Sequence, residues 1–166
     1  YKKTVTDVLD TLSDAEINKF MDMLLDAYKN EKFVFVIGNG GSAANASHLA
    51  QDLAKGTRQT PDQKKRLKAL SLTDNTPFIS AQGNDEGYDS IFEQQLRTFA
   101  SPGDYVIAIS GSGNSPNILR AVEWQIDHFE ELPVLVIPCL RGAKAPFVPV
   151  PAIANSSYYG SIYPSV

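Results

Sequence analysis

Cysteine is nearly absent from this sequence, because Cys139 is the only one in 166 residues. A single cysteine cannot form a disulfide within the chain, so the protein is expected to fold without such bonds and to occupy a reducing cytoplasm. A chain of this length buries roughly 68–70% of its unfolded surface, which is enough for a hydrophobic core that needs no disulfide or metal. Length and composition therefore predict one domain over residues 1–166.

Long hydrophobic runs and an excess of positive charge are missing as well. The longest apolar stretches, such as 33–37 and 134–137, are far too short to cross a membrane. The chain carries 15 basic and 19 acidic side chains, a net charge of −4, which argues against nucleic acid or an anionic membrane as the main partner. The one basic run, 64–68, is interpreted as a solvated loop leading into a strand.

The two ends of the chain differ from its middle. Residues 1–31 have the spacing of a helical lead-in with one apolar face, which core packing or contact with another subunit would explain equally well. Residues 133–166 contain no acidic side chain and hold six of the ten prolines. We expect this last segment to be an atypical C-terminal part and the functional protein to be longer than 166 residues.

Between these ends, apolar runs typical of buried strands alternate with helical segments. The strands are expected at 33–37, 68–72, 104–109, 133–137 and 147–150, and the helices at 43–55, 88–99 and 117–125. This alternation predicts an α/β fold with a parallel, right-handed sheet covered by helices on both faces. In such sheets the ligand site lies beyond the carboxyl ends of the strands.

Two loops rich in glycine and hydroxyl groups follow predicted strands. The first is Gly38-Asn39-Gly40-Gly41-Ser42, where glycines allow a ligand close to the backbone and the next helix begins with a hydroxyl. The second is Ser110-Gly111-Ser112-Gly113-Asn114-Ser115, which has the composition of a phosphate cradle made of hydroxyls and amides. One such loop is often simple turn chemistry, but two at one sheet edge predict an anion site.

Nucleotide sites fit these loops less well. The sequence has no Gly-x-x-x-x-Gly-Lys-Ser/Thr string, which excludes a P-loop. Gly38-x-Gly40-x-x-Ala43 satisfies a loose dinucleotide fingerprint, but the acidic residue expected about 20 positions later is missing. A nicotinamide enzyme is therefore a minor alternative, and no nucleotide cofactor is predicted.

Two polar pairs lie near the loops in the sequence. His48 and Asp52 are four residues apart and therefore share a helix face. They could serve as two metal ligands, as a base with the group that orients it, or as an ordinary surface ion pair. Asn84 and Asp85 follow Gly83 in a predicted turn on the ligand side of the sheet. The pattern alone leaves both pairs open between function and local structure.

Together these motifs resemble the sugar isomerase (SIS) domain family, and most closely its phosphoheptose isomerase branch, over about residues 5–126. The resemblance implies a three-layer, doubly wound fold with a five-stranded parallel sheet, a homotetramer with sites between subunits, and a sugar-phosphate ligand. It also implies interconversion of sedoheptulose 7-phosphate and a manno-heptose 7-phosphate through an enediol. The residues that it assigns to the phosphate and its loop are Ser42, Ser110, Gly111, Ser112 and Ser115.

The resemblance assigns further roles and exposes two departures. Asn39, Gly40, Gly41, Asn84 and Asp85 would line the sugar, and His48 matches a zinc ligand. The family's catalytic glutamate, also a zinc ligand, is Asp52 here, one methylene shorter. The branch also uses a glutamine and a histidine from a final helix, and nothing like that helix is found after Pro151.

Two functions remain open at this point. The first is an aldose-ketose isomerase that uses His48 and Asp52 for catalysis, with zinc as a candidate cofactor. The second is a non-catalytic phosphosugar-binding or replication-initiator-associating regulator of the same family. The retention of both His48 and Asp52 favours the isomerase.

Overall fold

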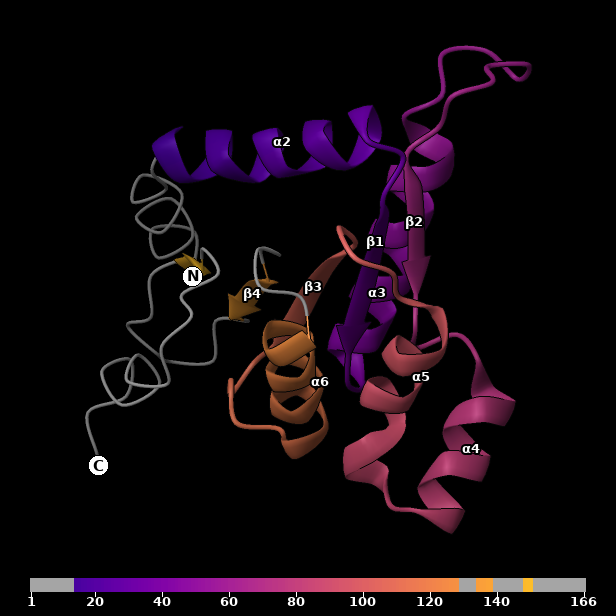
Figure 1. Ribbon diagram of the computed structural model, residues 1–166, viewed down its shortest axis with the longest axis vertical. Helices are drawn as coiled ribbons and strands as arrows, with labels where there is room; N and C mark the ends of the chain where they lie inside the picture. Colours follow the sequence, from indigo (N-terminus) through magenta and orange to yellow (C-terminus); the bar gives the residue numbers. More distant parts are fainter. Residues whose placement is uncertain (1–13, 129–133, 139–147, 151–166) are drawn as a thin grey trace.

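The computed structural model describes residues 14–128 and the backbone of two later strands, 134–138 and 148–150 (Figure 1). Most of the segment 133–166, which the sequence marks as atypical, lies outside these described residues. The helical lead-in is confirmed in its described part, as helix α2 spans Asp14–Lys29. The part of the chain that the structure describes contains no helix long and apolar enough to cross a membrane.

In the sheet, β1 has a parallel neighbour on each side. β1 (Phe33–Gly38) pairs in parallel with β2 (Lys68–Ser71) on one side and with β3 (Tyr105–Ser110) on the other. β4 (Val134–Pro138) continues the parallel pairing beside β3, and β5 (Val148–Val150) pairs antiparallel with β4. The full order is β2-β1-β3-β4-β5.

The α/β fold with helices flanking a parallel sheet is confirmed, but the expectation of five parallel strands is wrong. The strands whose side chains are described number three, β2, β1 and β3, and the fifth strand of the sheet runs antiparallel. The reason is the connection: β4 and β5 are joined by only nine residues, whereas a parallel crossover takes a dozen or more.

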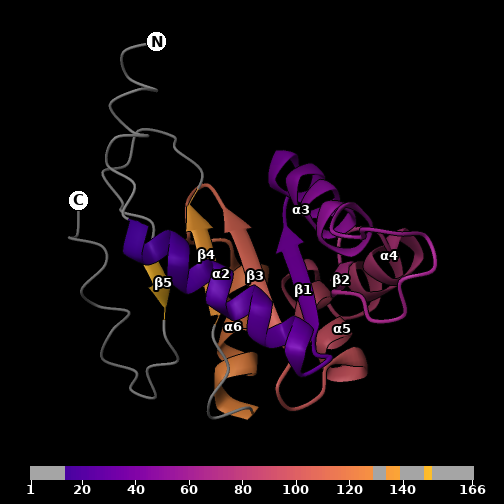
Figure 2. The same ribbon diagram turned by 90° about the horizontal axis from the view of Figure 1, so that it is seen from above.

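One face of the sheet is covered by α2 and by α3 (Gly41–Gln51). Their buried side chains Leu24, Ala27, Ala46 and Ala50 pack against Val34 and Val36 of β1 and against β3. α2 crosses the sheet between β5 and β1 (Figure 2). The Tyr105 hydroxyl at the start of β3 donates to the Asp26 carboxylate of α2. The pKa of that hydroxyl is raised, mainly by its burial and to a smaller extent by this hydrogen bond.

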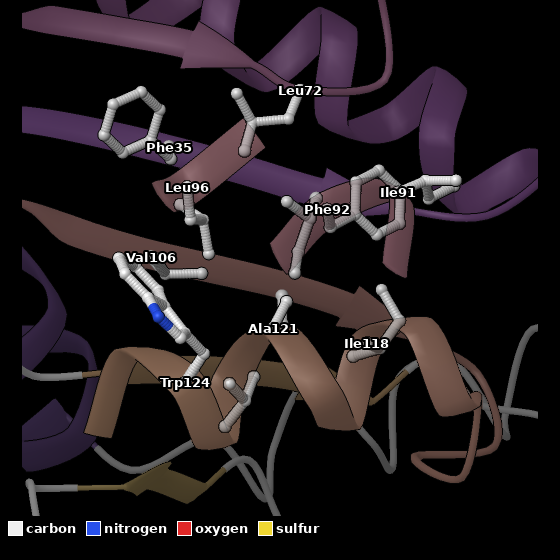
Figure 3. Close-up of a cluster of buried hydrophobic side chains, with 12 residues drawn as sticks. Phe35, Leu72, Ile91, Phe92, Leu96, Val106, Ile118, Ala121 and Trp124 are labelled. Atoms are coloured by element: carbon white, nitrogen blue, oxygen red, sulfur yellow. The ribbon is translucent and has the colours of Figure 1, made fainter. Parts of the chain in front are cut away.

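The opposite face is covered by α5 (Ile91–Phe99) and α6 (Pro116–His128), which lie in front of the sheet in Figure 1. Their side chains meet those of β1 and β3 in a second core, which includes Phe35, Phe92, Leu96, Val106 and Trp124 (Figure 3). The two cores complete the three-layer arrangement, in which β1 is buried on both faces from Val34 to Gly38.

A short helix, α4 (Thr76–Asp85), stands where the sequence suggested a turn. Asn75 caps it by accepting the N–H of Phe78, and Pro77 occupies its first turn. Helix α4 has no buried residue, so the apolar spacing that reveals most helices is missing. A 3₁₀ turn, η2 (Tyr88–Ser90), links α4 to α5.

Candidate functional site

The first loop leaves β1 and enters α3 under tight steric conditions. A Cβ on Gly38 would lie 2.6 Å from the Ser42 carbonyl oxygen, because the first turn of α3 passes directly over this residue. Gly40 adopts a φ of 54°, a conformation that side chains rarely take. Nothing lies within 4 Å of where a Cβ on Gly40 or Gly41 would stand, so this side of the loop is open.

The second loop is shaped by its own serines. The buried Ser110 hydroxyl accepts the N–H of Gly113 at 3.1 Å, and the Ser112 hydroxyl accepts the N–H of Asn114 at 3.2 Å. The carbonyl of Ser115 accepts the N–H groups of Ile118 and Leu119, both at 3.0 Å, and so opens α6 behind the loop. Because a hydroxyl that accepts can still donate, Ser110 keeps a proton for a ligand.

The structure brings the two loops together at one edge of the sheet. β1 and β3 are neighbours, and Gly38 is paired with Ile109. The amides of Asn39 in the first loop and Asn117 in the first turn of α6 bond reciprocally, at 2.9 Å and 2.8 Å. The Tyr88 hydroxyl of η2 also donates to Asn39 Oδ1, at 3.3 Å. Asn117 and Tyr88 were not predicted, because their partner lies far away in the sequence.

His48 and Asp52 form the predicted pair on the same helix as the first loop. His48 Nε2 lies 3.5 Å from Asp52 Oδ2, and their side chains are 75% and 58% exposed. Asp52 begins a π-helical turn, η1 (Asp52–Gly56), which continues α3. At about 1.5 Å per residue, His48 and Asp52 lie about 10 Å and about 16 Å beyond Gly41 along the helix axis.

Asn84 and Asp85 are at the end of α4 and not in a turn, which corrects the local prediction. Asn84 Nδ2 donates to Asp85 Oδ1 at 2.7 Å, and both residues are exposed. A Cβ built on Gly83 would lie 3.8 Å from the ring of Tyr88, whose hydroxyl donates to Asn39, so this end of α4 is connected to the first loop through Tyr88. Their contact with a sugar stays a prediction.

An ion-pair network joins α5, η2 and α6. The Glu93 side chain of α5 is only 5% exposed and is held by Arg97 on its own helix and by Arg120 on α6. Arg120 also pairs with Asp89 of η2 at 3.1 Å. The hydrogen bond with Glu93 raises the pKa of the Arg120 guanidinium. The pairing of Glu93 with Arg97 could be expected from their spacing of four residues, but the pairing of Glu93 with Arg120 on α6 could not be read from the sequence.

Comparison with known proteins assigns the family. The family model described as the SIS domain matches residues 1–125. The chain belongs to the SIS domain family.

Relatives of this SIS domain are phosphoheptose isomerases. The phosphoheptose isomerase of Campylobacter concisus is 38% identical over 123 residues, which are 74% of this chain and 62% of that protein. The one in Clostridium acetobutylicum is 42% identical over 106 residues, 64% of this chain and 53% of that protein. The chain thus spans about three fifths or less of the length of these relatives.

Solved structures agree with this assignment of the SIS fold. A phosphoheptose isomerase from Neisseria gonorrhoeae matches with a TM-score of 0.72 and 29% identity, over 86% of this chain and 71% of that one. A phosphoheptose isomerase from Francisella tularensis matches with a TM-score of 0.74 and 27% identity over the same shares. The fold and family predicted from the motifs are therefore confirmed, and the roles of single site residues stay predictions.

Proposed function

We propose that this SIS domain binds a sugar phosphate between its two loops and belongs to an aldose-ketose isomerase of the sedoheptulose 7-phosphate type. The observation that carries the proposal is the juxtaposition of the loops at the carboxyl ends of β1 and β3, tied by the Asn39–Asn117 amide pair. The names of its relatives support the choice of substrate.

The phosphate is held by hydroxyl groups in this proposal. Ser42 stands at the start of α3, and Ser110, Ser112 and Ser115 lie on the second loop. Hydroxyl donors and the positive ends of α3 and α6 stabilise a dianion without a lysine. The open space beside Gly40 and Gly41 leaves room for the sugar next to the backbone.

Isomerisation requires a base beside the first two carbons of the sugar. In the proposal, the Asp52 carboxylate removes the proton from C1 of the ketose, the oxygen on C2 gains a proton, and the enediol forms. Return of a proton to C2, with loss of the proton from the oxygen on C1, gives the aldose. The role of His48 is to orient Asp52 or to share a metal with it.

Zinc is the cofactor that fits this pair. Two ligand atoms bound at about 2.1 Å in a tetrahedral site are about 3.4 Å apart, close to the 3.5 Å between His48 Nε2 and Asp52 Oδ2. Among the described residues no third metal-ligating side chain joins them, so further ligands must come from elsewhere. A bound zinc ion would polarise the substrate carbonyl and stabilise negative charge on its oxygen.

The proposal includes a homotetramer whose sites lie between subunits. The resemblance to phosphoheptose isomerases supports sites between subunits, and in this proposal the loops of one copy face the His48–Asp52 pair of another, since Asp52 lies about 16 Å along α3 from Gly41. α2 supports this, because Ile17, Met21 and Leu25 are 41–47% exposed along one side of the helix. Beside them is an apolar hollow of about 710 Å³ between α2 and residues 53–67.

A second candidate is a regulator of the same family that binds phosphosugar without turnover. It is favoured by the exposure of His48 and Asp52 and by the lack of a third metal ligand in the described part of the chain. Both candidates share the same phosphate site, and they differ only in proton transfer.

Incubation of the full-length native protein with sedoheptulose 7-phosphate and zinc, followed by NMR of the sugar, tests the proposal. We expect aldose to form, and Asp52→Asn to abolish its formation while the ligand still binds, since an amide cannot accept the proton. Chelation of zinc should lower the rate. Binding without turnover in the wild type would favour the regulator, and absence of binding would contradict both candidates.

A further inference from the structure

The buried side chain of Asn117 connects the first loop to the helix that follows the second loop. It is 2% exposed in the first turn of α6, immediately after the second loop. Its Nδ2 donates to Asn39 Oδ1 and its Oδ1 accepts from Asn39 Nδ2, across 78 residues of sequence. Both polar atoms of the Asn117 side chain are therefore used on the first loop.

Asn39 needs such a partner, because it is flanked by residues with little conformational restraint of their own. It stands between Gly38 and Gly40, the latter at a φ of 54°. Asn117, by contrast, belongs to a helix of 13 residues that packs on the sheet through Ile118 and Ala121. The amide pair thus transfers the rigidity of α6 to the first loop.

A second connection starts one helical turn further along α6. Arg120 pairs with Asp89 of η2, and the adjacent Tyr88 donates to Asn39 Oδ1. The amide oxygen of Asn39 therefore receives two donors, both held in place by α6. Because its oxygen is occupied, the Asn39 side chain can offer a ligand only its remaining amide N–H, which suits an oxygen of a phosphate or sugar.

We propose that Asn117 is a positioning residue that sets the separation of the two loops and the orientation of the Asn39 amide, so that one sugar phosphate can contact both loops. This inference rests on the proposed function. It predicts that loss of Asn117 weakens ligand binding through Asn39, although Asn117 itself is buried beneath the loop and serves the ligand only indirectly.

The test measures the affinity for sedoheptulose 7-phosphate by isothermal titration calorimetry and the melting temperature by differential scanning calorimetry. Asn117→Ala should weaken binding about tenfold or more, since small displacements of binding groups are costly. Gln125→Ala is the matched control, because Gln125 is also a buried amide on α6 but bonds to the Asp104 carbonyl, away from the loops. It should lower the melting temperature and leave affinity within about twofold.

Two further variants make the result decisive. Asn39→Ala combined with Asn117→Ala should bind no more weakly than Asn39→Ala alone, because Asn117 acts through Asn39. Asn117→Leu keeps the side-chain volume if the alanine variant does not fold, and should show the same loss of affinity. Wild-type affinity in the Asn117 variants, or an equal loss in Gln125→Ala, would overturn the inference alone. A wild-type chain that does not bind would overturn the proposed function as well.

Discussion

At the scale of single residues, Gly38 shows how the sequence can point to the right residue for an incomplete reason. Its position after a strand predicted close approach of a ligand to the backbone. In the structure the close neighbour is the chain itself, since the Ser42 carbonyl of α3 lies over the missing Cβ. Asn39 is similar: its expected role is to line the sugar, yet most of its amide is bonded to Asn117 and Tyr88.

Gly38→Ala should therefore destabilise the fold by about 1–3 kcal/mol, because the backbone of α3 must move away from the new methyl group. Gly83→Ala is the matched control, since its Cβ would make an ordinary contact of 3.8 Å with Tyr88 inside a helix. That change should be neutral or slightly stabilising. Urea unfolding measures both variants, and equal stability of Gly38→Ala and the wild type would refute the steric account.

At the scale of elements, α2 bears on an alternative that its sequence pattern left open, namely packing in the core or contact with another subunit. Leu24 and Ala27 face the core, whereas Ile17, Met21 and Leu25 form an exposed apolar row on the same helix. Core packing thus accounts for one part of its apolar surface. The exposed row supports the proposed contact between subunits.

Met21→Glu should consequently reduce the mass of the assembly measured by sedimentation equilibrium, because burying a carboxylate in an apolar interface is costly. Lys19→Glu introduces the same side chain on another, exposed side of α2 and should leave the mass unchanged. A tetramer that persists in Met21→Glu would show that this row is not the interface, and a monomeric wild type would contradict the homotetramer.

α4 shows where element prediction fails. Strands β1 and β3 can be recognised from their continuous apolar runs. Helix α6 can be recognised from the helical spacing of its apolar residues and from Pro116 in its first turn. α4 has no buried residue and contains Pro77 and Gly83, so its sequence reads as a turn. Its helical form depends on the Asn75 cap and on contacts such as Gln82 with Ser90, which cannot be recognised before the chain is folded.

At the scale of the whole molecule, chain order predicted the feature that matters most for function. Alternating strands and helices place both loops at one sheet edge, and the adjacency of β1 and β3 confirms it. The antiparallel β5 could have been expected from its short connection to β4, whereas the bonds that join the loops across 78 residues could not be read from the sequence. Long-range partners of this kind have no local signal, so only the folded chain reveals them.

The central claim is that one sugar phosphate binds between the first loop and the second. Titration of the ¹⁵N-labelled chain with sedoheptulose 7-phosphate, followed by amide NMR, tests it most directly. The account predicts saturable shifts concentrated at residues 39–42 and 110–115. Saturable shifts confined to α2 and residues 53–67, or no shifts at all, would contradict it.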